Sequence, residues 1–160
     1  GDWSSDVCSS DLTVDFNLSW FWRQCQGNME RFNQLGCVFR NSEIASEESL
    51  VAAEAWLEET LDYIRNINPR ILGLSVFSIQ QHRSIWRLTN AVRQRFPHIK
   101  IVLGGLGLNV GCSSLSTEPG FRKIDLIKPF HQYAKEKGLT DHIVLGQALD
   151  ELIEIGRAHV

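Results

Sequence analysis

The sequence predicts an α/β domain in which a parallel β-sheet carries helices on both faces. Three compact apolar segments lack polar alternation, which is typical of strands buried on both faces of a parallel sheet. The segments between them have helical periodicity. Alternation of strand and helix along the chain is the order that produces a parallel sheet between layers of helices.

The two ends of the chain can be encoded by DNA sequences that are reverse complements of each other. Asp6 to Leu12 can be written GAC GTG TGC TCT TCC GAT CTC, and the reverse complement, GAG ATC GGA AGA GCA CAC GTC, encodes Glu154 to Val160. Asp2 to Ser5 extend the match into a common sequencing adapter. We therefore expect residues 1–12 and 154–160 to be translated adapter, and residues 13–153 to be a domain truncated at both ends.

The composition between these ends excludes several classes of protein. Four of the 19 acidic residues and one of the 16 basic residues lie in the end segments, so the remainder is formally neutral. It contains no Lys/Arg run suited to nucleic acid or an anionic membrane, and no apolar stretch of the ~20 residues that a membrane span needs. Cys25, Cys37 and Cys112 have neither disulfide-framework nor zinc-site spacing, so we expect free thiols in a cytoplasmic protein.

The N-terminal third begins irregularly and ends in a long helix. Thr13–Asn17 is predicted as a short strand, and residues 18–40, interrupted by two glycines, as broken helix and loop. Ser46, followed by two glutamates, predicts a helix start, and Asn68-Pro69 predicts its end. The residues expected to face the core share helical spacing: Leu50, Ala53, Leu57, Leu61 and Ile64.

Three buried strands are predicted at residues 71–77, 100–104 and 142–145. The helix after the first should bury Ile85, Leu88, Val92 and Phe96 and stop at Pro97. After the second strand we expect a loop over residues 107–120. A helix opened by Pro129 and capped by Gly138 should follow, with Phe130, Tyr133 and Ala134 inward. Gly146 should begin a final helix that carries Leu149 and Leu152.

Ligands of open parallel sheets bind beyond the carboxyl ends of the strands. Those ends should lie at residues 75–81, 104–109 and 146–149. Serine hydroxyls there can form hydrogen bonds, and glycines allow a flat ligand to approach the backbone.

One part of the chain resembles a known family. It comprises the segment Gly73-Leu74-Ser75-Val76-Phe77-Ser78, an amphipathic helix and the segment Ile101-Val102-Leu103-Gly104-Gly105. It is similar to the third and fourth strands of the cobalamin-binding domains of cobalamin-dependent radical S-adenosylmethionine proteins. The resemblance implies a Rossmann-like, flavodoxin-like sheet with its first strand missing and Thr13–Asn17 as its second strand. His142–Gly146 resembles the closing strand, although Gly146-Gln147-Ala148-Leu149 departs from the family's Gly-Glu-Gly-Glu.

The resemblance also implies a pocket for the dimethylbenzimidazole tail of cobalamin. The implied cofactor-binding residues are Ser75, Phe77, Ser78, Gly104, Gly105, Leu106, Gly107 and Gly146. No Asp-x-His-x-x-Gly motif is present, and we expect His82 to be a solvated histidine near a helix start rather than a metal ligand. The chain also lacks the Cys-x-x-x-Cys-x-x-Cys motif, so we expect no catalytic residues. An iron–sulfur cluster and S-adenosylmethionine would bind to another part of the longer parent protein.

We therefore expect a cobalamin-binding module of a larger radical S-adenosylmethionine enzyme that performs methyl transfer or rearrangement. Its partners would be cobalamin and the radical S-adenosylmethionine barrel of the same parent protein, not nucleic acid or a membrane. In the family, the loop after strand one forms one wall of the cofactor site. Because that strand is missing here, we expect the fragment to bind cobalamin weakly or not at all. A degenerate Rossmann-like docking domain without cofactor, using Trp20–Trp22, is one alternative. A nucleotide-dependent transferase is another, although no Gly-x-Gly-x-x-Gly is present.

Overall fold

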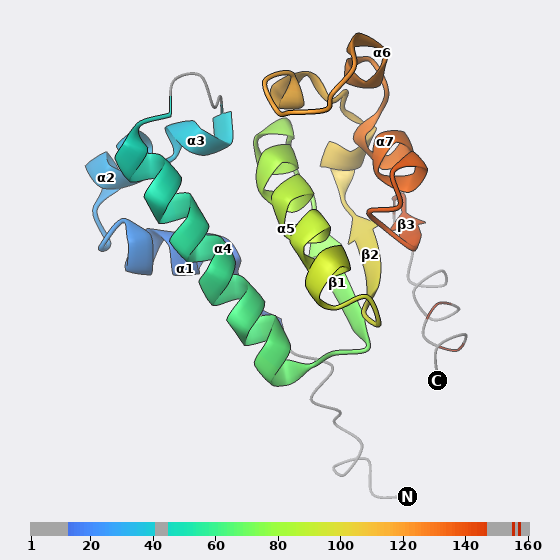
Figure 1. The fold of residues 1–160 in the computed structure, drawn as a ribbon, viewed down its shortest axis with the longest axis horizontal. Coiled ribbons are helices and arrows are strands. Elements are labelled where there is room, and N and C mark those ends of the chain that lie inside the picture. Colours follow the sequence, from blue (N-terminus) through green and yellow to red (C-terminus); the bar gives the residue numbers. More distant parts are fainter. Residues whose placement is uncertain (1–12, 41–44, 147–154, 156, 158–160) are drawn as a thin grey trace, which may run out of the picture.

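Three parallel strands form the sheet. The computed structural model describes residues 13–40, 45–146, 155 and 157. β1 (Ile71–Ser75), β2 (Lys100–Gly104) and β3 (His142–Val144) pair in the order β1-β2-β3, all parallel. Each lies within a segment predicted as a buried strand, so the α/β class and the parallel sheet are confirmed (Figure 1).

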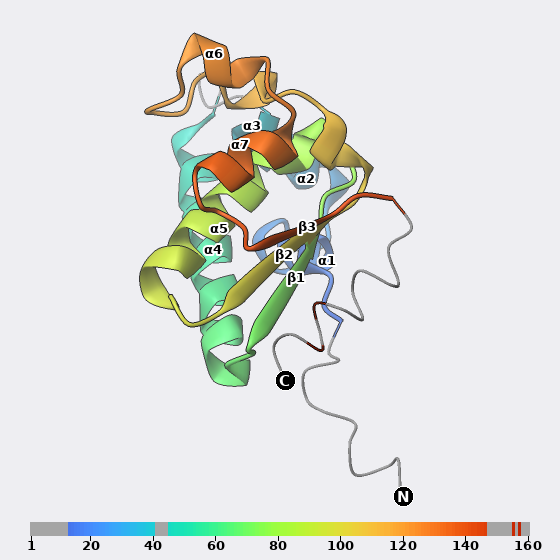
Figure 2. The same ribbon diagram turned by 90° about the vertical axis from the view of Figure 1, so that its right-hand side faces the viewer.

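The helices that connect the strands lie on one face of the sheet. α5 (His82–Arg95) joins β1 to β2, and α7 (Phe130–Glu136) lies between β2 and β3. Because each strand pairs with its predecessor, right-handed crossovers place both helices on the same side (Figures 1 and 2). Helices on both faces are therefore not seen in the described residues, and the predicted final helix over residues 147–152 lies outside them.

The main core lies between the sheet and these helices. Alternate strand residues face α5, whose predicted core positions are all buried. The predicted inward residues of α7 are buried as well. One cluster contains, among others, Leu74, Val76, Ile85, Leu88, Val92, Phe96, Ile101, Leu103, Phe130, Tyr133 and Ala134.

A second core is built from the N-terminal segment. This segment comprises α1 (Phe16–Ser19), a π-helical turn η2 (Trp20–Gln24), α2 (Met29–Leu35) and α3 (Cys37–Arg40). The series of short helices confirms the broken helix predicted for this part of the chain. The strand predicted at 13–17 is wrong. The Asp15 carboxylate accepts hydrogen bonds from the amides of Asn17 (2.9 Å) and Leu18 (3.2 Å) and starts α1 instead.

α4 (Glu47–Ile67) packs on both cores (Figure 1). Its start is as predicted, with the Ser49 amide donating to the Ser46 hydroxyl at 3.1 Å, and Asn68 ends it in the left-handed region at φ 48°. The predicted core position Leu50 is instead 40% exposed, while Trp56 is buried against the N-terminal segment. A helix between two cores has two buried faces, which a single apolar stripe does not describe.

The connection between β2 and α7 is less irregular than predicted. It contains two 3₁₀ turns, η5 (Leu106–Asn109) and η6 (Ser113–Leu115), and the short helix α6 (Lys123–Leu126), which was not predicted. A further 3₁₀ turn, η4 (Ile79–Gln81), precedes α5.

The predicted adapter segments lie almost wholly outside the described residues. Of them only Ile155, which is half-buried, and Arg157, which is exposed, are described. Among the described helices, none has both the length and the apolar character to cross a membrane.

Candidate functional site

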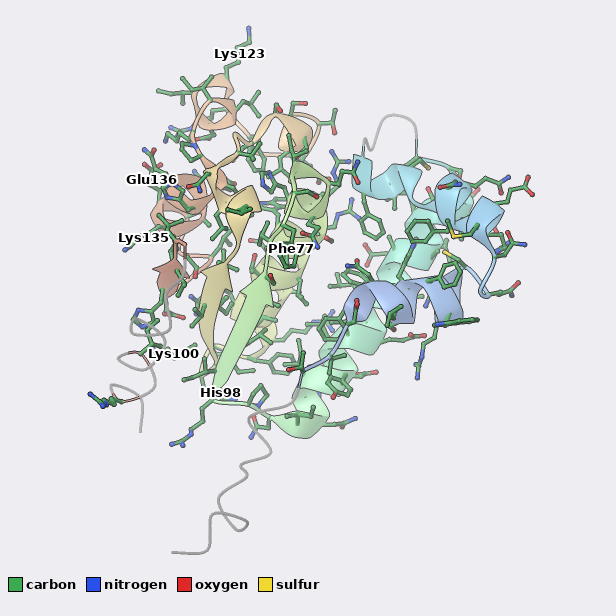
Figure 3. The ribbon with its side chains drawn as sticks, turned by 180° about the vertical axis from the view of Figure 1, so that it is seen from behind. Phe77, His98, Lys100, Lys123, Lys135 and Glu136 are labelled. Atoms are coloured by element: carbon green, nitrogen blue, oxygen red, sulfur yellow. The ribbon has the colours of Figure 1, made fainter. Side chains whose placement is uncertain are left out.

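The predicted cofactor-binding residues gather at the carboxyl ends of the three strands. Phe77 and Leu106 expose 70% and 73% of their surface, and Phe77 projects from the face of the sheet opposite α5 (Figure 3). Exposed Gly146 follows β3. The predicted residues around the ends of β1 and β2 are Ser75, Phe77, Ser78, Gly104, Gly105, Leu106 and Gly107.

Two of the glycines are required by the chain's own backbone. Gly105 has φ +109°, and a Cβ there would lie 2.3 Å from the Val76 carbonyl oxygen. A Cβ on Gly107 would lie 2.6 Å from the Ser78 amide nitrogen. The Gly107 amide donates to the Val76 carbonyl at 2.8 Å, and the Val76 amide donates to the Gly104 carbonyl at 2.7 Å. These glycines therefore let the turn after β2 pack onto the end of β1.

Three other small residues lie on the open face of the sheet, beside Val102, which is in register with Gly73, and Val144, which is in register with Gly104. Gly73 and Ser75 lie on β1, and Ser75 is in register with Gly104 on β2. A Cβ on Gly73 would meet nothing within 4 Å, and one on Gly104 would make only ordinary contacts with Val144, at 3.8 and 3.9 Å. A flat group could therefore approach the sheet here.

His82 is not the solvated histidine that its position predicted. It is fully buried, its Nε2 lies 2.7 Å from the Gly107 carbonyl oxygen, and its ring stacks on Phe130 with centroids 4.4 Å apart. Burial lowers its pKa, opposed by the hydrogen bond to Gly107. Within the described residues its Nδ1 has no hydrogen-bond partner. The turn after β2 covers this end of α5, which sequence periodicity could not reveal.

Arg83, which no sequence pattern singled out, is a buried cation that joins three parts of the chain. Its guanidinium donates to the carbonyls of Val38 (3.2 Å) and Ser114 (2.6 Å), and its Nε lies 3.2 Å from a carboxylate oxygen of Glu118. Burial lowers the pKa of Arg83, and the charge of Glu118 opposes that shift. An arginine one position after His82 carries no sequence signal for such a role.

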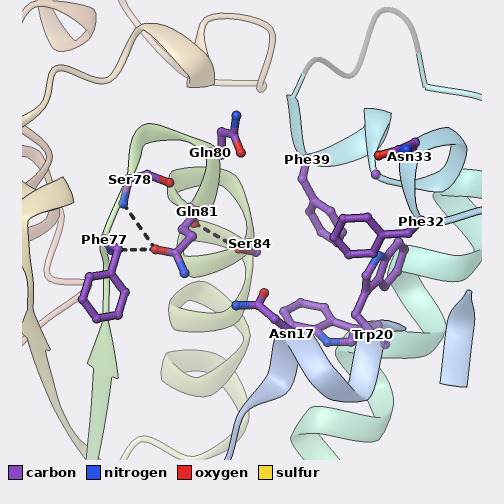
Figure 4. A pocket seen from close by; sticks show the side chains of 12 residues that line it. Asn17, Trp20, Phe32, Asn33, Phe39, Phe77, Ser78, Gln80, Gln81 and Ser84 are labelled. Carbon is purple, nitrogen blue, oxygen red and sulfur yellow. Dashed lines mark hydrogen bonds between the residues drawn. The ribbon is translucent and has the colours of Figure 1, made fainter. Parts of the chain in front are cut away.

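A cavity of about 420 Å³ lies between the carboxyl end of β1 and the N-terminal segment (Figure 4). One wall comes from the end of β1 and the start of α5: Phe77, Ser78, Gln80, Gln81 and Ser84. The other comes from the N-terminal segment and α4: Asn17, Trp20, Phe32, Asn33, Gly36, Phe39 and Trp56. None of these side chains is charged.

Both walls of this cavity are held by contacts of their own. The Gln81 side-chain oxygen accepts from the amides of Phe77 (2.6 Å) and Ser78 (3.3 Å). On the other side the Phe39 ring packs edge-on against Trp20 and Trp56, with centroids 4.8 and 5.7 Å apart. Of the predicted cofactor-binding residues, only Phe77 and Ser78 line the cavity.

Comparison with known proteins assigns no family. No family model, curated protein or solved structure matches this chain. The interpretation of the site therefore depends on its own chemistry.

That chemistry offers no metal centre in the part of the chain that the structure describes. No group of three His, Cys, Asp or Glu residues there could hold a metal ion. Cys25, Cys37 and Cys112 are free thiols, as predicted, and burial, together with the charge of Asp125, raises the pKa of Cys112 to about 11.

Proposed function

We propose that this domain binds the nucleotide tail of cobalamin on the open face of the sheet, as a module of a larger radical S-adenosylmethionine enzyme. The observation that carries the proposal is the floor of small residues, Gly73, Ser75 and Gly104, beside exposed Phe77 and Leu106. Such a surface suits a flat, uncharged aromatic group, because the ring can approach the backbone and cover apolar side chains that water otherwise contacts.

The residues present fit a benzimidazole ring with a polar attachment. Phe77 and Leu106 provide apolar contact at the edge of the floor, and Leu145, 45% exposed, follows β3. Ser75 and Ser78 bring hydroxyl groups, which can donate to or accept from the ribose and phosphate of the tail. In this proposal Gly105 and Gly107 shape the turn that carries Leu106, rather than contacting the ring.

The finer fold assignment belongs to the same proposal. In the flavodoxin-like arrangement that we propose, another strand would pair with β1, and further helices would cover the part of the open face that the cobalamin tail leaves free. The free edge of β1 and the position of α4 beside α5 support this arrangement (Figure 1).

Bound cobalamin would supply a cobalt centre that carries methyl groups or supports radical rearrangement. The residues of this chain would bind the tail and orient the cofactor toward the rest of the parent. We assign no cobalt ligand, because His82 is fully buried beneath the turn after β2.

Equilibrium dialysis against hydroxocobalamin tests the proposal, with the visible absorbance of the corrin as the readout, and it detects weak binding. Gly104→Leu would place a branched side chain over the floor, whereas Gly104→Ala adds one methyl group at ordinary contact distances. We expect the leucine variant to bind at least tenfold more weakly than the alanine variant. We also expect cobinamide, which lacks the nucleotide tail, to bind more weakly than cobalamin. Equal binding by the two variants, or no retained corrin, would refute the proposal.

A docking domain without cofactor is the second candidate. Of the aromatic segment Trp20–Trp22 expected to form its contact surface, Trp20 is buried, whereas Trp22 exposes 65% of its surface; Leu18 and Met29 in the same N-terminal segment expose 56% and 60%. In this candidate the exposed apolar side chains would contact a partner protein. If dialysis shows no cobalamin binding, this candidate is favoured.

A further inference from the structure

The cavity between the N-terminal segment and α5 has two walls of different chemistry (Figure 4). The wall from the N-terminal segment and α4 is mainly aromatic, with Trp20, Phe32, Phe39 and Trp56. The facing wall is mainly polar, with Ser78, Gln80, Gln81 and Ser84. The volume of about 420 Å³ is within the range of small-molecule sites, roughly 300–1,000 Å³.

The cavity does not use the edge of β1 at which the proposed fold pairs another strand. β1 ends at Ser75, and the first residue of this part of the chain that lines the cavity is Phe77. The polar wall therefore belongs to the turn after β1 and to the start of α5.

The two walls are joined by a buried hydrogen bond. Arg83 on α5 is 1% exposed, and its guanidinium donates to the Val38 carbonyl of α3 at 3.2 Å. Val38 directly precedes Phe39 of the aromatic wall. On that wall the Trp56 indole N–H also donates to the Phe16 carbonyl at 3.1 Å, which ties α4 to α1. A ligand would therefore enter a cavity that is already formed, which lowers the cost of binding.

Hydrogen bonds of the chain itself decide what the polar wall offers. The Gln81 side-chain oxygen accepts from the amides of Phe77 (2.6 Å) and Ser78 (3.3 Å). Because these two donors require an acceptor, the other end of the carboxamide is the Nε2 group, which can only donate. None of the residues that line the cavity is charged, so a phosphate or carboxylate would find no counter-charge among them.

We propose that this cavity binds an uncharged heteroaromatic ring of purine size, with an edge acceptor directed to Gln81 Nε2. A flat ring has an apolar face suited to aromatic side chains and carries carbonyl oxygens or ring nitrogens in its plane. Phe77 and Ser78 border both this cavity and the proposed tail site, whereas Gln81 and Ser84 belong to the cavity alone. The inference does not depend on the proposed cofactor.

Two positions on α5 and the turn before it provide the variants. Ser84→Phe and Ser84→Ala both remove the hydroxyl that donates to the Gln81 carbonyl at 3.0 Å, but only phenylalanine fills part of the cavity. Gln81→Glu keeps oxygen acceptors for the two amides and removes the Nε2 donor. Far-UV circular dichroism and urea denaturation establish that the variants fold.

The probes are radiolabelled hypoxanthine and adenine, measured by equilibrium dialysis at neutral pH. Indole is the control ring without an edge acceptor, and AMP is the control that adds a phosphate to adenine. We expect at least one of the two bases to bind the unsubstituted chain and Ser84→Ala alike. Ser84→Phe and Gln81→Glu should bind that base at least tenfold more weakly, and indole and AMP should bind the unsubstituted chain at least tenfold more weakly than the base.

Several results would overturn the proposal. These are the absence of binding by either base, equal affinity of Ser84→Phe and Ser84→Ala, or equal binding of indole and the bases. If Ser84→Phe does not fold, Gln81→Glu and indole still decide the matter. Gly104→Leu, which targets the proposed tail site, should leave base binding unchanged. Loss of base binding in that variant would place the ring on the sheet and would also contradict the proposal.

Discussion

Replacing Gly105 by alanine should destabilise the fold far more than the same change at its neighbour Gly104. Gly105 has φ +109° and ψ 162°, a region that essentially only glycine adopts. Its new methyl group would lie 2.3 Å from the Val76 carbonyl oxygen and 2.9 Å from the carbonyl carbon. These are backbone atoms, so the clash can be relieved only by moving β1 or the turn after β2.

The magnitude follows from two separate costs. Forcing a non-glycine residue into such a backbone conformation costs on the order of 1–3 kcal/mol. Inserting a methyl group into a closely packed contact costs roughly another 1–3 kcal/mol. Gly105→Ala should therefore lower the free energy of unfolding by about 2–6 kcal/mol. At Gly104 the nearest contacts are 3.8 and 3.9 Å, and we expect a change within about 1 kcal/mol of either sign.

Urea denaturation followed by tryptophan fluorescence measures both variants under identical conditions. If the urea midpoint of Gly105→Ala equalled that of Gly104→Ala, the turn after β2 would not pack onto the end of β1 as described. The result also bears on cofactor binding. Loss of a ligand in any Gly105 variant reports on the fold as well as on the site, which is why Gly104 is the better position to test the proposed tail pocket.

Three further outcomes follow from buried polar groups. Arg83→Met removes one partner of a buried ion pair and should lower the free energy of unfolding by roughly 3–5 kcal/mol in urea titrations; a change below 1 kcal/mol would contradict the observed network. Because burial lowers the pKa of His82 below its ordinary 6.5, the unfolded chain binds that proton first as the pH falls. Stability should therefore decrease below about pH 6.5, by at most about 1.4 kcal/mol per pH unit from this group, and His82→Gln should remove that component. Cys112, with its pKa raised to about 11, should resist iodoacetamide at pH 8 until the protein is unfolded, whereas half-buried Cys37 should react first in mass-spectrometric mapping.

The sequence by itself determined the three strands of the sheet and the helices α4, α5 and α7. Continuous apolar runs predicted β1, β2 and β3, because apolar segments without polar alternation are typical of the strands of parallel sheets. Helical spacing and end signals likewise predicted α4, α5 and α7. These are local properties, since an N-cap serine or a helix stripe acts within a few residues of its own position.

Only the tertiary structure decided how those elements are used. Thr13–Asn17 has a strand-like pattern, but Asp15 caps a helix there. Gly105 and Gly107 suggest a ligand cradle in sequence, but the nearest atoms to them belong to Val76 and to its neighbours Phe77 and Ser78. His82 is buried by residues that are 25 and 48 positions away, Gly107 and Phe130. Such contacts form between segments distant in sequence, and no local pattern encodes which backbone will lie against which side chain.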